Sequence, residues 1–246
     1  MTDGVLDLPP LEPAAGRRME QTIAAVRSAV DDGRMTPGVK YSVYQLAEAL
    51  GISRTPVREA LLQLEQVGLI RFEQRQGFRI LLPDPKEIAD IFAVRLSLEI
   101  PAVRRVAAQP TPGLCKRLDD EMAALRAAAH SGDESLFAHH DQLLHDAVLE
   151  AADNARARAI ISSLRETTRL LGASTADRTR SLFDIDAEHR PIVSAIVDRD
   201  APRAEAALRD HLVSTGRLLV AQAVRDQQAD ADPDSIWFCA TAHLLG

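Results

Sequence analysis

The sequence predicts a mainly α-helical protein in two parts: a small N-terminal unit of three helices and a β-hairpin, followed by an all-α antiparallel helical bundle. Three observations lead to this prediction. The chain has 246 residues, which is enough for two domains of unequal size. Strand-like patterns occur only between residues 69 and 82. Aromatic residues make up only 4% of the chain, and Ala, Leu and Arg dominate, a composition typical of helical bundles.

The chain begins with a segment that has no regular period. Residues 1–16 contain several prolines and are predicted to be a flexible arm. Residues 18–32 then repeat apolar side chains at three- and four-residue intervals. This spacing predicts an amphipathic helix, which Gly33 would end.

The next two helices are predicted from their end signals. Ser42 can cap the first of them, and Gly51 can end it. Ser53 can cap the second, which Gly68 can end in the left-handed conformation. A helix, a three-residue turn and another helix follow one another here, which is the order of a helix-turn-helix.

A β-hairpin is expected directly after this pair of helices. Residues 69–73 and 78–82 alternate or run apolar in the manner of strands, and residues 74–77 would form the tip. In this position the hairpin is a wing, so the unit as a whole is predicted to be a winged helix-turn-helix.

Every segment after Pro83 and Pro85 is helix-like. Helices are expected over about residues 86–108, 112–131, 133–152, 154–174, 181–199 and 201–228. The predicted organisation is an arm (1–16), a winged helix-turn-helix domain (17–82), a linker (83–85), an all-helical effector-binding and dimerisation domain (86–228) and a C-terminal tail (229–246). The tail contains an apolar stretch, residues 235–239, for which two alternatives are open: docking on the bundle or on a partner subunit.

The formal net charge of -7 conceals a division along the chain. Residues 17–82 carry 10 Lys and Arg and 7 Asp and Glu, a net of +3, whereas residues 83–246 carry 19 basic and 26 acidic groups, a net of -7. A basic unit joined to an acidic one is compatible with the first approaching phosphates while the second stays away from them.

Membrane and secreted proteins are disfavoured by the sequence. No apolar run approaches the ~18 residues that a membrane span needs, and the N-terminus lacks a secretory signal. Cys115 and Cys239 are far apart and form no CxxC spacing, so neither a disulfide framework nor a thiolate metal site is indicated. A cytoplasmic protein without membrane contact is expected.

The predicted third helix begins with side chains suited to DNA. Arg54 and Arg58 lie one turn apart on the same face, with Thr55 beside them. The N-terminal end of such a helix points into the major groove. Arginine can bind guanine with two hydrogen bonds or clamp a phosphate, and the sequence leaves both open.

The stretch from Tyr44 to Leu69 resembles the GntR superfamily of winged-helix regulators, above all in Gly51-Ile52-Ser53-Arg54-Thr55-Pro56-Val57-Arg58-Glu59-Ala60-Leu61. The resemblance covers nearly all of residues 20–82. Tyr44 is a departure, because some relatives carry a basic contact near that position. The resemblance implies operator DNA as a partner, contacted by Arg54, Thr55 and Arg58. It also implies that Gly77 lets the wing approach the minor groove. Arg75 and Arg34 are weaker candidates for DNA contact.

One aspartate and three histidines are spaced so that they could meet inside the bundle. Asp141 and His145 are four residues apart and share a helical face. His189 and His211 lie on the last two predicted helices, which antiparallel packing would bring together. One carboxylate and three imidazoles suit a divalent transition metal. Spacing alone does not separate such a site from histidines that make local hydrogen bonds.

The second half resembles the FadR-type C-terminal effector domain in Arg95, Glu99, the Asp141 and His145 pair, Asn154, Glu188-His189 and His211-Leu212. The resemblance implies a metal, often zinc or nickel, and a carboxylate effector that completes its coordination shell. Two alternatives stay open for Arg95, which either binds the effector or pairs with Glu99. Asn154 either contacts the ligand or caps the following helix. The implied metal ligands are Asp141, His145, His189 and His211.

Together these features predict a ligand-responsive DNA-binding transcriptional regulator that is not an enzyme. We expect a homodimeric repressor on a two-fold operator, with a small organic acid as effector. In one alternative the metal itself is the signal. In another the chain is a metal-dependent hydrolase, since three histidines and an aspartate can activate water, although the sequence places no additional general base.

Overall fold

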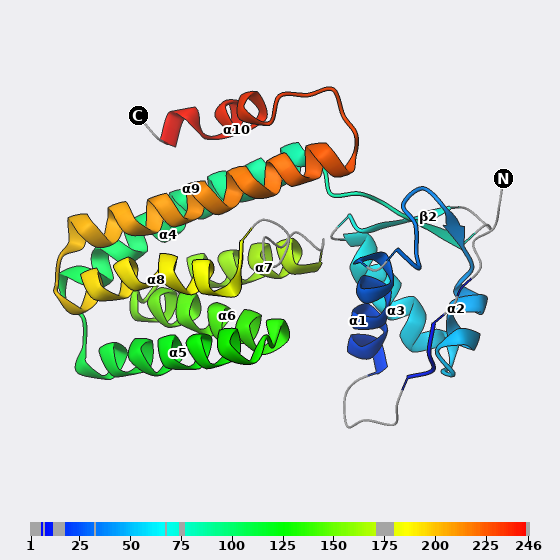
Figure 1. Ribbon diagram of the computed structural model, residues 1–246, viewed down its shortest axis with the longest axis horizontal. Helices are drawn as coiled ribbons and strands as arrows, with labels where there is room; N and C mark the ends of the chain where they lie inside the picture. The colour runs from blue at the N-terminus through cyan, green and yellow to red at the C-terminus, as the bar shows by residue number, and fades with distance from the viewer. Residues whose placement is uncertain are drawn as a thin grey trace. The chain divides into compact units, whose positions relative to one another are not determined.

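The computed structural model describes residues 6, 8–11, 18–31, 33–66, 68–73, 77–170 and 180–244 (Figure 1). The chain up to Pro83 belongs to one compact unit, and most of the remainder belongs to a second. Within the described ranges, no helix is both long and apolar enough to cross a membrane.

The first unit contains the predicted helix-turn-helix and hairpin. The Ser42 hydroxyl accepts a hydrogen bond from the backbone N–H of Tyr44, so the expected cap is present. One face of the third helix is buried in the core of the unit, through Val57, Ala60, Leu61 and Leu64. The elements are α1 (Arg18–Asp31), β1 (Lys40–Tyr41), α2 (Val43–Ala49), α3 (Arg54–Gln66), β2 (Ile70–Glu73) and β3 (Gly77–Ile80).

The short strand β1 was not predicted from the sequence. It pairs with β3, which also pairs with β2, in an antiparallel sheet of order β1-β3-β2. Phe78 lies opposite both Tyr41 and Phe72, with ring centroids 6.0 Å and 6.5 Å away. Two residues are too few to show an alternating pattern, so the strand results from packing against Phe78 rather than from a local signal.

The second unit is helical, and its helices agree with the predicted ranges. Their ends differ by at most two residues, except at the end of α7, where the predicted residues 171–174 lie outside the described residues. Side-chain caps begin several of them, among them Asp84, Thr111, Asp133 and Ser181. The helices are α4 (Pro85–Ala108), α5 (Pro112–Ser131), α6 (Glu134–Ala151), α7 (Ala155–Leu170), α8 (Leu182–Val197), α9 (Ala201–Asp226) and α10 (Pro233–Thr241), followed by the short helix η1 (Ala242–Leu244).

The two longest helices, α4 and α9, lie side by side along the second unit (Figure 1). Helix α8 packs on both of them, and α5 packs on α6 and α8. The candidate site residues come from four of these helices: Arg95 and Glu99 from α4, Asp141 and His145 from α6, His189 from α8 and His211 from α9.

The segment predicted as a C-terminal tail contains helix α10, which packs on α4 and α9. It lies on the other side of this pair from α5 and α6 (Figure 1). Trp237 is only 4% exposed there. The apolar tail therefore docks on its own bundle, which is one of the two alternatives that the sequence left open.

Candidate functional site

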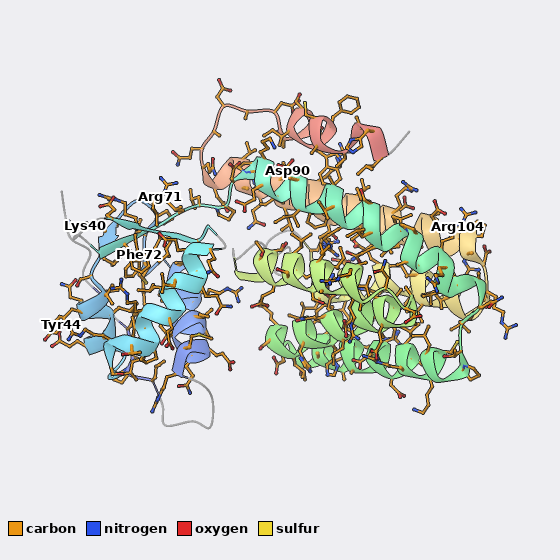
Figure 2. The ribbon with its side chains drawn as sticks, turned by 180° about the vertical axis from the view of Figure 1, so that it is seen from behind. Lys40, Tyr44, Arg71, Phe72, Asp90 and Arg104 are labelled. Carbon is orange, nitrogen blue, oxygen red and sulfur yellow. The ribbon has the colours of Figure 1, made fainter. Side chains whose placement is uncertain are left out.

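The predicted DNA contacts of the third helix line a surface hollow on the first unit. The hollow has a volume of about 530 Å³, and its walls come from the start of α2, from α3 and from the start of β3. Tyr44, which the sequence analysis treated only as a departure, also lines the hollow and is 62% exposed. Its side chain is labelled in Figure 2. The lining residues are Ser42, Val43, Tyr44, Arg54, Thr55, Arg58, Glu59, Leu62 and Gly77.

Two residues of this hollow are set in place by the sheet. The guanidinium carbon of Arg58 lies 6.0 Å from the ring centroid of Phe72 on β2. Gly77 has a φ of +93°, and a Cβ at this position would lie 2.1 Å from the carbonyl oxygen of Tyr41. Glycine is therefore required by the close approach of β3 to β1, a reason different from the approach to DNA that the resemblance implied.

Of the two weaker candidates, the structure describes only Arg34. Arg34 Nη2 lies 3.4 Å from the hydroxyl oxygen of Ser28, and Arg34 does not line the hollow. Arg75 lies outside the described residues.

In the second unit, three of the four predicted metal ligands form one compact group, and the fourth, Asp141, contacts one member of it. His145, His189 and His211 are buried, and one ring nitrogen of each lies within 4.8 Å of the others. The Nε2 atoms of His145 and His189 are 3.3 Å apart. Asp141 Oδ1 lies 3.0 Å from His189 Nε2. Side chains from three helices thus lie close together, as the spacing and the assumed antiparallel packing predicted.

The other ring nitrogen of each histidine faces an acceptor outside this cluster. A neutral imidazole that donates from Nδ1 keeps its lone pair on Nε2. When the three rings are neutral, their Nε2 lone pairs and one carboxylate oxygen point inward, and this is a donor set for a divalent metal ion. The Nδ1 contacts are His145 to Glu99 Oε2 (3.2 Å), His189 to the Ile185 carbonyl (2.8 Å) and His211 to Glu188 Oε2 (3.1 Å).

An arginine holds each of the two glutamates in turn. Arg95 Nε donates to Glu99 Oε1 over 2.7 Å inside the bundle. Arg180 Nη1 donates to Glu188 Oε2 over 2.5 Å, and its Nη2 donates to the hydroxyl of Thr215 over 3.1 Å. Sequence reasoning missed Arg180 and gave Glu188 no role of its own. The position of Glu188 directly before a candidate ligand was the only signal.

Arg165 on α7 is a further residue that the sequence analysis missed. Its Nη2 lies 2.5 Å from Asp141 Oδ2. Among the residues that the structure describes, two buried donors near this cluster, Arg165 Nε and Arg95 Nη2, have no hydrogen-bond partner. Leaving a buried donor unpaired costs about 1–3 kcal/mol, and more when the group is charged. These two N–H groups are therefore available to an anion.

The protonation states of the cluster suit metal binding. Burial lowers the pKa of His145 to about 3, with the Arg165 charge adding to the effect, and burial together with His189 lowers the pKa of His211 to about 4. Burial would raise the pKa of Asp141, but Arg165 and His189 outweigh it and hold that pKa well below its usual range. At neutral pH His145 and His211 are uncharged and Asp141 is ionised, as ligands must be.

The two tentative effector contacts have different environments. Arg95 pairs with Glu99 and still has a free donor, so its two predicted roles are compatible with each other. Asn154 is exposed, and its Oδ1 accepts a hydrogen bond from Ala157 N over 3.1 Å. The structure thus gives Asn154 the capping role at the start of α7 and places it outside the buried cluster.

Two family models match these two units. Residues 18–80 match the model described as "Bacterial regulatory proteins, gntR family", and residues 90–214 match the FCD domain. The chain belongs to the GntR family. It is a DNA-binding transcriptional regulator whose second domain is the FCD domain found in FadR-like members.

The relatives of this GntR-family protein are also transcriptional regulators. It is 29% identical to the probable D-xylose utilization operon transcriptional repressor of Paenarthrobacter nicotinovorans over 208 residues, which is 82% of this chain and 91% of the relative. It is 27% identical to the transcriptional regulator LutR of Bacillus subtilis over 212 residues, 77% of this chain and 95% of LutR. Because the family and these relatives are regulators, the chain is not an enzyme, as predicted.

A solved structure supports the fold. McbR/YncC of Escherichia coli superposes with a TM-score of 0.62 at 23% identity, over 83% of this chain and 98% of that one. The winged helix-turn-helix followed by a helical domain is therefore an arrangement that this GntR-family protein shares with a protein of distant sequence.

Proposed function

We propose that this GntR-family protein is a homodimeric repressor whose affinity for operator DNA is controlled by a small organic acid bound beside a divalent metal ion in the FCD domain. One observation carries the proposal. Three inward-facing imidazole nitrogens and a carboxylate oxygen lie next to two buried arginines that each have an unpaired N–H group.

The donor set fits zinc or nickel. Imidazole nitrogens and a carboxylate oxygen are ligands that both ions accept, and Asp141, His145, His189 and His211 would hold the ion. When bound, the metal would supply a Lewis-acidic position for an oxygen of the effector. The protein supplies hydrogen-bond acceptors for the three Nδ1 atoms, so that Nε2 is the nitrogen of each ring that can bind the metal.

The charges around the ligands favour an anionic effector over the metal alone as the signal. Imidazoles bind a metal in their neutral form, and with the three histidines in that form the remaining ionised groups of the cluster sum to zero without a metal. A divalent cation would leave two positive charges uncompensated in a mostly buried site, which is unfavourable. An organic acid would neutralise them and could pair with the free donors of Arg95 and Arg165. The ionised groups are Arg95, Arg165, Arg180, Glu99, Asp141 and Glu188.

Operator contact is assigned to the hollow on the first unit. Arg54, Thr55 and Arg58 are exposed at the start of α3, where side chains reach base edges and phosphates. Two such units in a dimer would bind two half-sites. By linkage, an effector that changes DNA affinity must have its own affinity changed by DNA to the same extent. One relative is named as a repressor, and for a repressor we expect the effector to release the DNA.

The test compares DNA affinity in three states of the protein. Metal-free protein, protein loaded with zinc or nickel, and loaded protein with each of a set of organic acids are titrated against the DNA that flanks the gene. We expect affinity to change only when both metal and an acid are present. A change with metal alone would favour the metal-sensor alternative and defeat the proposal of an organic effector.

A pair of variants assigns the response to the site. Arg95→Gln should keep zinc uptake and DNA binding but lose the response to the acid. Arg117→Gln is the matched control, because Arg117 also pairs with a glutamate, Glu150, but is on the surface of α5. The control should respond like the wild type.

A further inference from the structure

Helix α10 brings the only tryptophan of the chain against α4. Trp237 is 4% exposed, and its ring centroid lies 6.2 Å from that of Phe92, which is fully buried. Residues 233–241 lie beyond both matched family regions, 18–80 and 90–214. The family match therefore gives no account of this contact.

A glycine on α9 makes room for the indole ring. A Cβ at Gly216 would lie 2.3 Å from Cζ3 and 2.4 Å from Cη2 of Trp237, and 2.9 Å from Cδ1 of Phe92. Real side chains do not approach so closely, so any other residue at position 216 would displace the indole. The two rings and this glycine form one tightly packed junction between α4, α9 and α10.

Polar contacts hold α10 on the same surface. Asp232 caps its first turn, and Arg217 of α9 pairs with Asp234 over 2.7 Å. Beyond the end of the helix, Arg209 Nη1 donates to the carbonyl oxygen of Leu244 over 3.0 Å. The helix is thus tied to α9 on both sides of Trp237.

Phe92 connects this junction to the candidate site. The guanidinium carbon of Arg95 lies 4.8 Å from the Phe92 ring centroid, a cation–π contact in buried surroundings. The same guanidinium binds Glu99 through Nε and has its Nη2 unpaired. The position of the free Nη2 therefore depends on a ring that Trp237 packs against.

We infer that Trp237 is a positioning residue, which through Phe92 fixes the Arg95 guanidinium so that its free N–H group is presented to an anion. The role of the anion rests on the proposed function. The packing of Trp237, Phe92 and Arg95 does not, and this allows the two to be tested separately.

The test follows the Arg95 side chain by NMR in the metal-free full-length protein. The Arg95 Nε–H signal is assigned by its loss in Arg95→Lys. In the wild type it should exchange slowly with solvent, because it is buried and bonded to Glu99. In Trp237→Leu, and in Gly216→Ala, which displaces the indole without removing it, its exchange should accelerate by roughly tenfold. Gly216→Ala should also shift the Trp237 fluorescence to longer wavelength.

Two further variants separate positioning from general loosening of the bundle. Trp237→Phe keeps an aromatic ring and should restore slow exchange. Phe238→Ala changes the neighbouring residue, which is 68% exposed, and should leave exchange as in the wild type. Unchanged exchange in Trp237→Leu and Gly216→Ala would overturn the inference, as would an equal acceleration in Phe238→Ala.

Zinc uptake, measured on the same samples, reports on the proposed function alone. None of the four candidate ligands lies on α10, so uptake should be the same in the wild type and all the variants. If the wild type binds no zinc, the proposed metal site fails, and the Arg95 comparison still decides the role of Trp237.

Discussion

The Nε2 atom of His145 lies 3.3 Å from the Nε2 atom of His189, while the Nδ1 atoms of both rings face protein acceptors, Glu99 and the Ile185 carbonyl. In neutral rings this arrangement sets two lone pairs against each other, because the proton of each ring is used at Nδ1. A cation between the rings would remove the repulsion. The arrangement of these two rings is therefore the part of the structure that supports the proposed metal site.

Removal of two ligands should abolish metal binding. We expect His145→Ala combined with His211→Ala to lower zinc affinity by at least about 100-fold, because half of the donor set is lost. Metal content after dialysis against a competing chelator is the measurement. His140→Ala is the control, since His140 is also on α6 but binds Glu121 outside the cluster. Metal retention by the double variant would contradict the assignment of these ligands.

The glutamate behind His211 should matter although it is not a ligand. Glu188→Gln weakens the acceptor of the His211 Nδ1–H and the partner of Arg180, so zinc affinity should fall by about 10- to 100-fold. Glu121→Gln makes the same change at a glutamate that contacts His140 Nδ1 over 2.8 Å, away from the cluster. Equal zinc affinity in the two variants would show that Glu188 does not tune the site.

The part of this site that local spacing determines was predictable, and the part that depends on packing was not. Asp141 and His145 share a helical face by their four-residue spacing, and antiparallel packing of α8 and α9 brings His189 and His211 together. Arg165 and Arg180 reach the cluster from segments whose approach no periodicity encodes.

The same distinction holds for the fold. Helix ends were predictable because caps, prolines and glycines are local signals. The strand β1 could not be predicted, because it depends on pairing with Phe78 of β3. The burial of Trp237 could not be predicted either, because it depends on the missing side chain at Gly216. The apolar stretch at residues 235–239 indicated burial, but its partner could be found only in three dimensions.

The arginines of α3 should dominate DNA affinity. Arg54→Ala and Arg58→Ala should each weaken binding to the DNA that flanks the gene by about 10- to 100-fold, corresponding to about 1–3 kcal/mol. Fluorescence anisotropy at fixed salt measures this. Arg117→Ala removes the same charge from the surface of α5 and should leave affinity unchanged. If Arg54→Ala binds as tightly as the wild type, the DNA interface lies elsewhere.

A methyl group at Gly77 should destabilise the first unit. The new Cβ would meet the Tyr41 carbonyl oxygen at 2.1 Å in a backbone conformation that side chains rarely adopt, so we expect Gly77→Ala to lose roughly 2–4 kcal/mol. Gly113→Ala has no atom within 4 Å of its Cβ and lies in α5, so it should be neutral or slightly stabilising. Thermal unfolding of the two variants makes the comparison. Equal melting temperatures would mean that β3 can move away from β1.

The stability of the metal-free protein should fall as the pH is lowered from about 6 to about 4.5. His145 and His211 have a pKa of about 3 and about 4 in the folded protein, against an ordinary value of 6.5, so in this range the unfolded chain binds more protons than the folded one. Each such histidine should then reduce the free energy of unfolding by about 1.4 kcal/mol per pH unit at most.

The carboxylates of the site contribute in a different pH range. The pKa values of Glu188 and Asp141 are lowered on folding, so their stabilisation is present above about pH 4.5 and is lost only as the pH falls further. Urea unfolding followed by Trp237 fluorescence at several pH values between 4.5 and 6 therefore tests the histidines without a contribution from Glu188 and Asp141. His145→Gln cannot take up the proton at this position, and its stability should depend less steeply on pH than that of the wild type. A slope identical to that of the wild type would mean that His145 is already protonated, or accessible to solvent, in the folded protein.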